Sequence, residues 1–243
     1  LNLGWNQISN IDVLSDLSQL KRLSIWENKI SDISVLSKLV NLNFLNVDSN
    51  PIEDISVVAN FSKLTELGLG NTRTSDISSL ANLTDLTSLY LSDNQISDIS
   101  PLANLTKLTG VSLSGNQIKD ISVLSNLSRL DWLRLNGNQI TSLEPLRKLT
   151  ALQTLIIYNN PISDLEPLSN LLALKNFAAH DNPTITDLSG LSKLTALSSL
   201  NLSNCKVTDL SPLTNLTKLT ELNLNNNQIS DISPILENTG LSG

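Results

Sequence analysis

The stretch LYLSDNQISDISPL, residues 89–102, contains two different spacings of apolar side chains. Leu89 and Leu91 are separated by one residue, which is the period expected for a short β-strand with one buried face. From Ile99 onward the apolar residues recur at every third position, at Leu102, Leu105 and Leu108. A period of three fits 3₁₀ turns better than an α-helix. The stretch therefore predicts a strand, a turn and a 3₁₀-rich return segment.

The same pattern recurs along the whole chain. LNLGWNQISNIDVL at residues 1–14 and LNLNNNQISDISPI at residues 222–235 align with it without gaps. The spacing between copies is 22 residues, except for one extra residue within DNPTITD at residues 181–187. The copies begin at Leu1, Leu23, Leu45, Leu67, Leu89, Val111, Leu133, Leu155, Phe177, Leu200 and Leu222. A unit of this size cannot bury its own apolar side, so neighbouring copies must stack and share a core.

Stacking predicts an α/β-type repeat solenoid whose strands form a parallel β-sheet. The strand side packs closely and the return side is bulkier, so we expect the sheet on the concave face and the 3₁₀ turns on the convex face. Residues 1–243 are interpreted as a single domain of about eleven repeats, apparently cut at both ends. Ser before Pro opens several return segments, for example at Ser100, and is expected to act as their N-cap.

Composition excludes several classes of function. The chain has 243 residues, of which 40% are hydrophobic and 3% aromatic, and its formal charge is -7. Basic residues do not form a run, which argues against nucleic acid and anionic membranes as partners. No apolar stretch reaches about 18 residues, so we expect no membrane insertion. Cys205 is the only cysteine and therefore cannot form a disulfide within the chain.

The full pattern, L-x-L-x-x-N-x-I-x-D-I-x-P-L-x-x-L-x-x-L, resembles the leucine-rich repeat and covers essentially the whole chain. The 22-residue length, with NQISDISPL at residues 94–102 and LTKLTEL at residues 216–222, is most similar to the internalins, which are bacterial surface proteins. The resemblance implies an extracellular or cell-surface leucine-rich repeat horseshoe that engages protein ligands through its concave face. The internalins' helical N-terminal cap and immunoglobulin-like domain have no counterpart in this sequence, so we describe the chain as internalin-like.

Polar side chains also recur at a fixed place in the repeat. Asn occupies the sixth position of nine repeats, and we call this set the Asn ladder: Asn6, Asn28, Asn50, Asn94, Asn116, Asn138, Asn160, Asn182 and Asn227. We expect these amides to point inward and to bond backbone groups of adjacent repeats. Thr72 and Cys205 take this position in the other two repeats. A nucleophilic Cys205 would need the single histidine, His180, as its base, but the pattern points His180 outward and Cys205 inward. We interpret Cys205 as a substitute for Asn.

A second set of recurring residues is acidic: Asp32, Asp54, Asp76, Asp98, Asp120, Asp164, Asp187, Asp209 and Asp231. Carboxylates spaced by one repeat are potential Ca²⁺ ligands. The alternative, which we favour, is that each accepts turn N–H groups just before the 3₁₀ segment. We therefore expect no cofactor and no metal. Because the sequence lacks a convergent histidine, a metal cluster and a phosphate-binding glycine loop, we also expect no enzymatic activity.

The positions that vary between repeats lie on the predicted strand face, and specificity must come from them. Six of the eight aromatic residues map to that face or its margin. A first cluster contains Trp5, Trp26 and Phe44, and a second contains Trp132, Arg134, Ile156, Tyr158 and His180, with Tyr90 alone between them. Grouped, exposed Trp, Tyr and Arg side chains are typical of protein-interface hot spots. These nine residues are our predicted ligand-binding site.

We expect a non-enzymatic module that binds a protein through the concave face, in a bacterial adhesion or recognition protein. The first alternative is a carbohydrate-binding module, in which Trp and Tyr stack on sugar rings while Asn or Asp bonds hydroxyl groups. A second alternative is a structural spacer within a longer surface protein. In that case the aromatic residues are present because they suit strands and pack on one another.

Overall fold

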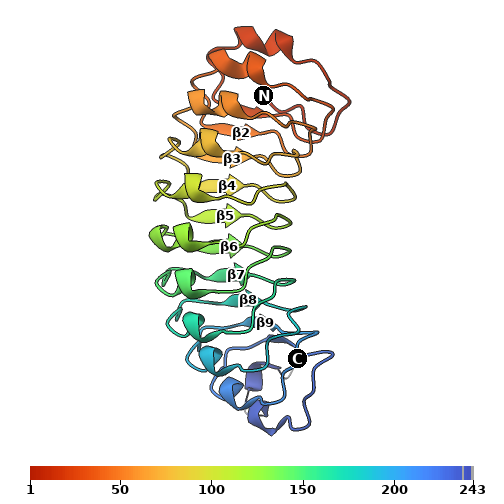
Figure 1. The fold of residues 1–243 in the computed structure, drawn as a ribbon, viewed down its shortest axis with the longest axis vertical. Coiled ribbons are helices and arrows are strands. Elements are labelled where there is room, and N and C mark those ends of the chain that lie inside the picture. The colour runs from red at the N-terminus through yellow and green to blue at the C-terminus, as the bar shows by residue number, and fades with distance from the viewer. Residues whose placement is uncertain (237, 242–243) are drawn as a thin grey trace. The chain divides into compact units, whose positions relative to one another are not determined.

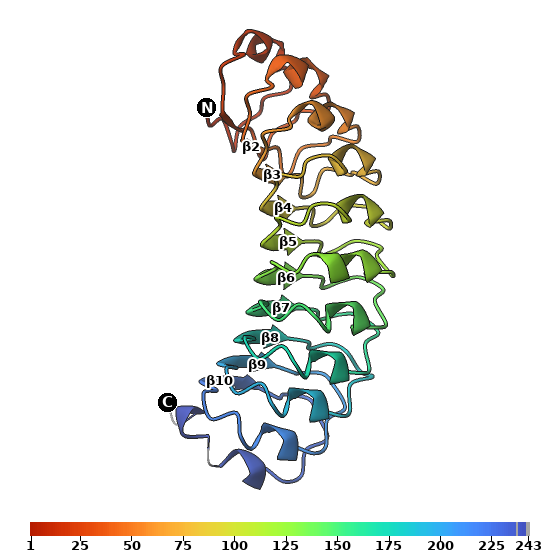
Figure 2. The same cartoon turned by 90° about the vertical axis from the view of Figure 1, so that its left-hand side faces the viewer.

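The structure is a computed structural model that describes residues 1–236 and 238–241. It divides into two compact units, Leu1–Ile118 and Lys119–Gly243, which we call the N-terminal and C-terminal units. Each unit is a stack of the predicted repeats (Figure 1). Within each unit the strands lie on one side of the stack and the 3₁₀ segments on the other (Figure 2).

The N-terminal unit carries a parallel sheet in chain order. Its strands are β1 (Arg22–Ser24), β2 (Phe44–Asn46), β3 (Glu66–Gly68), β4 (Ser88–Tyr90) and β5 (Gly110–Ser112). The first repeat joins β1 through a bridge between Asn2 and Ser24. The register pairs the buried central residue of each strand with that of the next, as in Leu23 with Leu45. The return segments contain η1 (Asp12–Asp16), η2 (Ser34–Lys38), η3 (Ser56–Asn60), η4 (Ser78–Leu80) and η5 (Ser100–Leu102).

The C-terminal unit repeats this arrangement. Its parallel strands are β6 (Trp132–Arg134), β7 (Thr154–Ile156), β8 (Asn176–Ala178), β9 (Ser199–Asn201) and β10 (Glu221–Asn223). The return segments contain η6 (Ser122–Asn126), η7 (Glu144–Leu146), η8 (Glu166–Leu168), η9 (Ser189–Leu191), η10 (Ser211–Leu213), η11 (Ser233–Ile235) and η12 (Thr239–Leu241). Phe177 still pairs with Leu200, so the extra residue at 181–187 is absorbed before β9 without a change of register.

The core of both units is built from the recurring Leu, Ile and Val residues, nearly all of which are fully buried. Phe61 and Phe177 occupy core positions that other repeats give to Leu, and both are buried. Strands of three residues and short 3₁₀ turns are the elements that the alternating periods predict. The leucine-rich repeat solenoid expected from the sequence is confirmed.

The Asn ladder points inward, as predicted, and Asn94 shows how it works. Its Nδ2 donates to the carbonyls of Leu69 at 2.7 Å, Leu91 at 3.1 Å and Ser92 at 3.2 Å. Its Oδ1 accepts the N–H groups of Thr72 and Thr74, both at 3.0 Å. One amide thus bonds five backbone groups of two adjacent turns. The three carbonyls also accept other donors, so the two N–H groups are the ones that rely on Asn94.

Cys205 fills the same position without the same bonds. It is 5% exposed, and its Sγ lies 3.5 Å from the Ala179 carbonyl oxygen and 3.7 Å from that of Ser203. Burial raises the pKa of the thiol, which disfavours the reactive thiolate. The interpretation of Cys205 as an inward-pointing ladder substitute is confirmed.

The recurring Asp residues bind turn N–H groups, as predicted. The Oδ1 of Asp98 accepts the N–H of Ser100 at 2.8 Å, and the same bond forms two residues after Asp32, Asp54, Asp76, Asp120, Asp164, Asp187, Asp209 and Asp231. The prediction that Ser is the N-cap is wrong. Ser100 is already inside η5, and the residue before it makes no capping bond. Asp98 reaches the free N–H instead, because it stands two residues upstream.

Metal-binding clusters and membrane-spanning helices are both absent from the part of the chain that the structure describes. Across residues 1–236 and 238–241, no group of three or more His, Cys, Asp or Glu side chains is arranged to hold a metal ion. In the same part of the chain, no helix has the length and apolar character needed to cross a membrane.

Candidate strand-face binding site

The strand face of each repeat presents three outward positions. They are the residue before the central strand residue, the residue after it and the residue three after it, so they form three columns across each sheet. The next residue ends the strand in a left-handed conformation, for example Glu27 (φ 52°), Asp93 (φ 57°) and Asn159 (φ 55°). This turn directs the chain away from the face and leaves the third column at its edge.

The first predicted cluster contains a tryptophan pair at that edge. Trp5 is 70% exposed and has a left-handed backbone (φ 59°). Its ring meets that of Trp26 edge-on, with centroids 5.6 Å apart and planes at 81°. Trp26 also lies against the backbone of Gly4, where an added Cβ would come within 2.1 Å of its indole nitrogen. Gly4 is thus required for the position of Trp26.

Phe44 does not join this pair. Phe44 lies in the first column and Trp26 in the third. These two columns are four residues apart along a strand, which corresponds to about 13 Å. Its partner is Arg22, whose guanidinium carbon lies 3.9 Å from the centre of the phenyl ring. The first cluster therefore consists of two separate pairs. The grouping by successive repeats missed this because it ignored the position within each repeat.

The second predicted cluster, on the C-terminal unit, is built around two stacked rings. Tyr158 and His180 have centroids 4.1 Å apart and planes at 14°. The Nδ1 of His180 lies 2.7 Å from Oδ2 of Asp181, and Oδ1 of Asp181 accepts a bond of 2.7 Å from the Asn204 amide. The bond to His180 is the main cause that lowers the pKa of Asp181. These bonds hold the stack in one orientation.

Three further residues extend the second cluster across the face. Arg134 is exposed, and in the register of β6 and β7 it pairs with half-buried Ile156. Trp132, also half-buried, lies in the first column of the same strand as Arg134. The cluster therefore runs from the first column to the third over adjacent strands.

Tyr90 is half-buried in β4 of the N-terminal unit, beside small residues. Two of these small residues, Gly68 and Gly70, do not leave open space on the face, because the side chain of Asp48 lies over them. A Cβ on Gly68 would come within 2.9 Å of Asp48 Oδ1, and a Cβ on Gly70 within 3.4 Å. Asp48 accepts the Gly70 N–H at 2.6 Å, while burial raises the pKa of its carboxyl. The sequence analysis missed Asp48, although its place in the third column marks it as a face residue.

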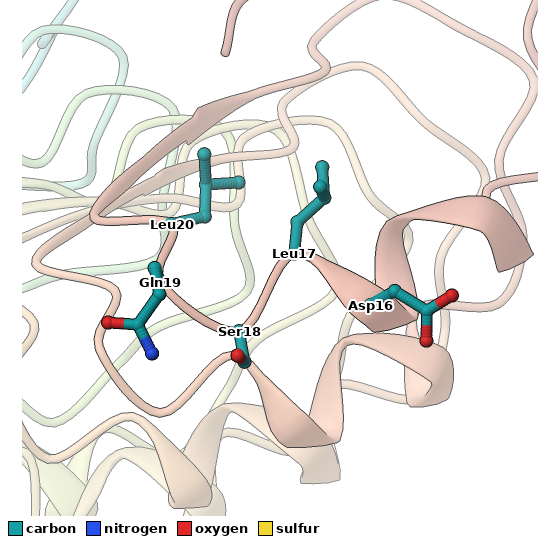
Figure 3. Close-up of a pocket in the computed structure, with 5 residues that line it drawn as sticks. All are labelled: Asp16, Leu17, Ser18, Gln19 and Leu20. Carbon is teal, nitrogen blue, oxygen red and sulfur yellow. The ribbon is translucent and has the colours of Figure 1, made fainter.

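A further hollow lies in the return segment of the first repeat, away from the strand face. It has a volume of about 440 Å³ and is lined by Asp16, Leu17, Ser18, Gln19 and Leu20 (Figure 3). Leu17 is 43% exposed there, whereas Leu39, its equivalent in the next repeat, is fully buried. The hollow is thus an uncovered interior surface of the first repeat. It does not gather convergent polar groups, so we do not assign the binding site to it.

Comparisons with known proteins place the chain in a family. The family model for leucine-rich repeats, in two-copy form, matches residues 18–60, 62–104, 84–126, 128–170 and 195–238. No curated protein matches significantly. Among solved structures, the fold is also similar to a plant peptide hormone receptor, RGFR1 in complex with RGF2, at 21% identity and TM-score 0.72, covering 94% of this chain and 43% of that one.

Two similar solved structures are internalins of Listeria monocytogenes. The internalin inlF is 40% identical with a TM-score of 0.86, covering 99% of this chain and 78% of that one. The internalin C2 (inlC2) is 37% identical with a TM-score of 0.68, covering 70% of this chain and 75% of that one. The chain therefore belongs to the leucine-rich repeat family and is a bacterial internalin-like member of it.

Proposed function

We propose that the chain is a non-enzymatic recognition module that binds a protein partner through the strand faces of its two units. The observation that carries the proposal is the second cluster. Tyr158 and His180 stack on an outward face and are held by Asp181, with Arg134 and Ile156 beside them. An oriented, partly apolar patch of this kind is suited to binding, because little side-chain freedom is lost when a partner docks.

The composition of the face favours a protein as the partner. Tryptophan, tyrosine and arginine dominate interface hot spots because they combine large apolar area with directed polar contacts. In this mechanism Trp132 and Tyr158 anchor the partner, and the exposed guanidinium of Arg134 sets its orientation. The Trp5–Trp26 and Arg22–Phe44 pairs supply a second contact area on the N-terminal unit.

The similarity to internalins supports a place outside the cell or on the bacterial surface. A surface or secreted setting would give this strand face access to an external ligand. From this similarity we infer a role for the chain in adhesion or recognition at a surface.

Carbohydrate binding is the second candidate, and one observation favours it. Trp5 presents 70% of its surface to solvent, and an exposed indole ring offers a flat platform for a sugar. The two candidates differ in a simple way. Removing glycans from the captured surface abolishes binding to a carbohydrate reader but leaves protein recognition intact.

The test is capture of solubilised surface proteins from candidate cells by the immobilised chain. We expect Trp132→Ala with Tyr158→Ala to weaken capture by about 30-fold or more, because hot-spot truncations each cost at least about 1 kcal/mol. The matched control is Val40→Ala with Leu172→Ala, which removes exposed apolar area outside the strands. Equal capture by the two variants, both folded by circular dichroism, contradicts the proposal and leaves the spacer interpretation.

A further inference from the structure

At the seventh position of the repeat, three successive repeats of the N-terminal unit lack the glutamine that is commonest there. Five repeats carry glutamine there: Gln7, Gln95, Gln117, Gln139 and Gln228. The three repeats that depart carry Lys29, Pro51 and Arg73. Two cations therefore flank a proline at equivalent places in the stack. This position lies beyond the left-handed turn, outside the three columns of the strand face.

A hollow forms where these residues meet. Its volume is about 310 Å³, and it is lined by Asn28, Lys29, Ser49, Asn50, Pro51, Asn71 and Arg73. Lys29 and Arg73 are two repeats apart, or about 10 Å along the stack. The short ring of Pro51 stands where five repeats carry the longer glutamine side chain. No carboxylate lines the hollow.

We propose that this hollow is a binding site for an oxyanion, namely a sulfate, phosphate or carboxylate group. Within residues 1–236 and 238–241, the side chains of Lys29 and Arg73 have no ion-pair partner. Lys29 and Arg73 both line the hollow, together with Pro51. A lysine point charge and an arginine fork together suit an anion that has two or more oxygen atoms.

The backbone of Arg73 is a second observation that points to a site. Its φ is 65°, a left-handed conformation that arginine adopts only under constraint, and no other residue described at the seventh position shares it. The residues on either side of Arg73 are both fixed by hydrogen bonds. Thr72 and Thr74 are buried, their hydroxyl oxygens lie 2.9 Å apart, and both donate backbone N–H groups to Asn94. Residues held in this way cluster at ligand sites.

The net charge of the whole chain determines which interactions can bind an anion at this site. With a formal charge of -7, the chain repels anions at long range. Binding must therefore come from short-range contacts with Lys29 and Arg73 rather than from a general basic field. The rim adds neutral hydrogen-bonding groups at Ser49 and Asn71, which are suited to the remaining oxygen atoms. The proposal does not depend on the function assigned to the strand face.

The test is a titration of the ¹⁵N-labelled protein with sodium sulfate, phosphate or acetate, against sodium chloride at equal ionic strength. We expect saturable shifts at the amides of Ser49, Asn71 and Arg73 with at least one oxyanion and not with chloride. Acetate binding alone points to an acidic protein side chain as the natural ligand. Binding of sulfate or phosphate points to a sulfated or phosphorylated group.

The decisive variant is Lys29→Gln with Arg73→Gln, which gives both positions the residue of the regular repeats. We expect it to weaken binding by about tenfold or more, because two charge-assisted contacts are lost. Lys29→Gln alone keeps Arg73 and its backbone unchanged, and should weaken binding in part. Lys206→Gln changes a cation at the same position in the C-terminal unit and should leave binding unaffected. Shifts equal to those in chloride, or unchanged affinity in the double variant, overturn the proposal.

Discussion

Asn94 in the N-terminal unit and Cys205 in the C-terminal unit occupy the same position of the repeat but differ in the backbone hydrogen bonds that they make. Asn94 accepts the N–H of Thr74, twenty residues earlier, at 3.0 Å. The equivalent N–H before Cys205 belongs to Ile185, and it bonds the carbonyl of Asn182 at 3.0 Å within its own repeat. The Ile185 N–H therefore needs no acceptor at position 205, and the donor that reaches the Cys205 sulfur is the Asn182 N–H. The substitution of Asn by Cys is tolerated because the Ile185 N–H finds its acceptor within its own turn.

Thr72 repeats this arrangement. The N–H that an asparagine at position 72 would accept belongs to Ile52, and it bonds the Asn50 carbonyl at 2.8 Å. In both cases a proline follows the preceding ladder residue, as Pro51 or Pro183. A proline ring fixes φ near the value that a tight reversal needs. Pro161 also follows a ladder residue, yet Asn182 in the next repeat is retained and accepts the Asn160 N–H at 2.9 Å. A proline in the preceding turn therefore permits the substitution without requiring it, and the following changes test that link.

The largest effect is expected for Asn94→Ala. The change leaves the backbone N–H groups of Thr72 and Thr74 without their acceptor in a buried place, and it removes one of the donors to each of three carbonyls. We expect a loss of about 3–5 kcal/mol in the free energy of unfolding. Chemical denaturation followed by circular dichroism measures it.

Asn6→Ala is the control for this prediction, since Asn6 holds the same ladder position but is exposed. Its loss should stay below about 1 kcal/mol because water replaces the bonds. Similar losses for both variants contradict the burial argument.

A smaller loss is expected for Cys205→Asn, although this change restores the residue of the regular repeats. The new Oδ1 could accept only the Asn182 N–H, because the Ile185 N–H already bonds the Asn182 carbonyl. The added amide thus gains one such bond, whereas Asn94 accepts two. Fitting the larger amide into a space that holds a thiol costs about 1–3 kcal/mol, which one hydrogen bond of about 1 kcal/mol offsets only in part. Thermal melts of the variant and the parent measure it. A gain in stability, which consensus reasoning favours, shows that the turn at Pro183 does not compensate for Cys205.

Cys205→Ala should have a weaker effect still. It removes a small side chain whose thiol makes only weak bonds to Ala179 and Ser203. We expect a loss of about 1 kcal/mol, mainly from lost packing. The same melts provide the measurement. A loss as large as that of Asn94→Ala means that the thiol holds its repeat as the amide does.

The sequence predicts the solenoid and its interior because one pattern is written many times. Leu23 and Asn94 could each be placed by comparison with their equivalents in other repeats, and a residue buried in one copy is buried in the next. Cys205 was placed by the same rule. The bond between Ile185 and Asn182 was not, since it depends on a local turn that the period does not encode.

The strand face was predicted less well, for a physical reason. Repeat number places a residue along the stack, but contacts also depend on its column along the strand. Phe44 was grouped with Trp26 by repeat number alone, and its column puts it beside Arg22 instead. Asp48 was missed because its effect depends on the empty space over Gly68 and Gly70, which appears only when neighbouring repeats are stacked.

The smallest effect is expected for Asp48→Asn. Asp48 is a third kind of polar side chain in the repeat, a buried carboxyl that accepts a backbone N–H, beside the amide of Asn94 and the thiol of Cys205. Burial raises the pKa of Asp48 above its usual 3.8. A raised pKa in the folded state means that the stabilising contribution is present below the unfolded pKa and lost as the pH rises through the folded one. At neutral pH the charged carboxylate therefore weakens the fold relative to a neutral group.

Asparagine keeps an oxygen to accept the Gly70 N–H, so Asp48→Asn should raise the melting temperature at about pH 7 and lose that advantage near about pH 3. Melts at both pH values, with exposed Glu53→Gln as the control, provide the measurement. If the variant melts lower than the parent at neutral pH, the 2.6 Å bond to Gly70 outweighs the burial of the charge. In that case Asp48 stabilises its repeat as Asn94 does, by its hydrogen bond, and differs in this from Cys205.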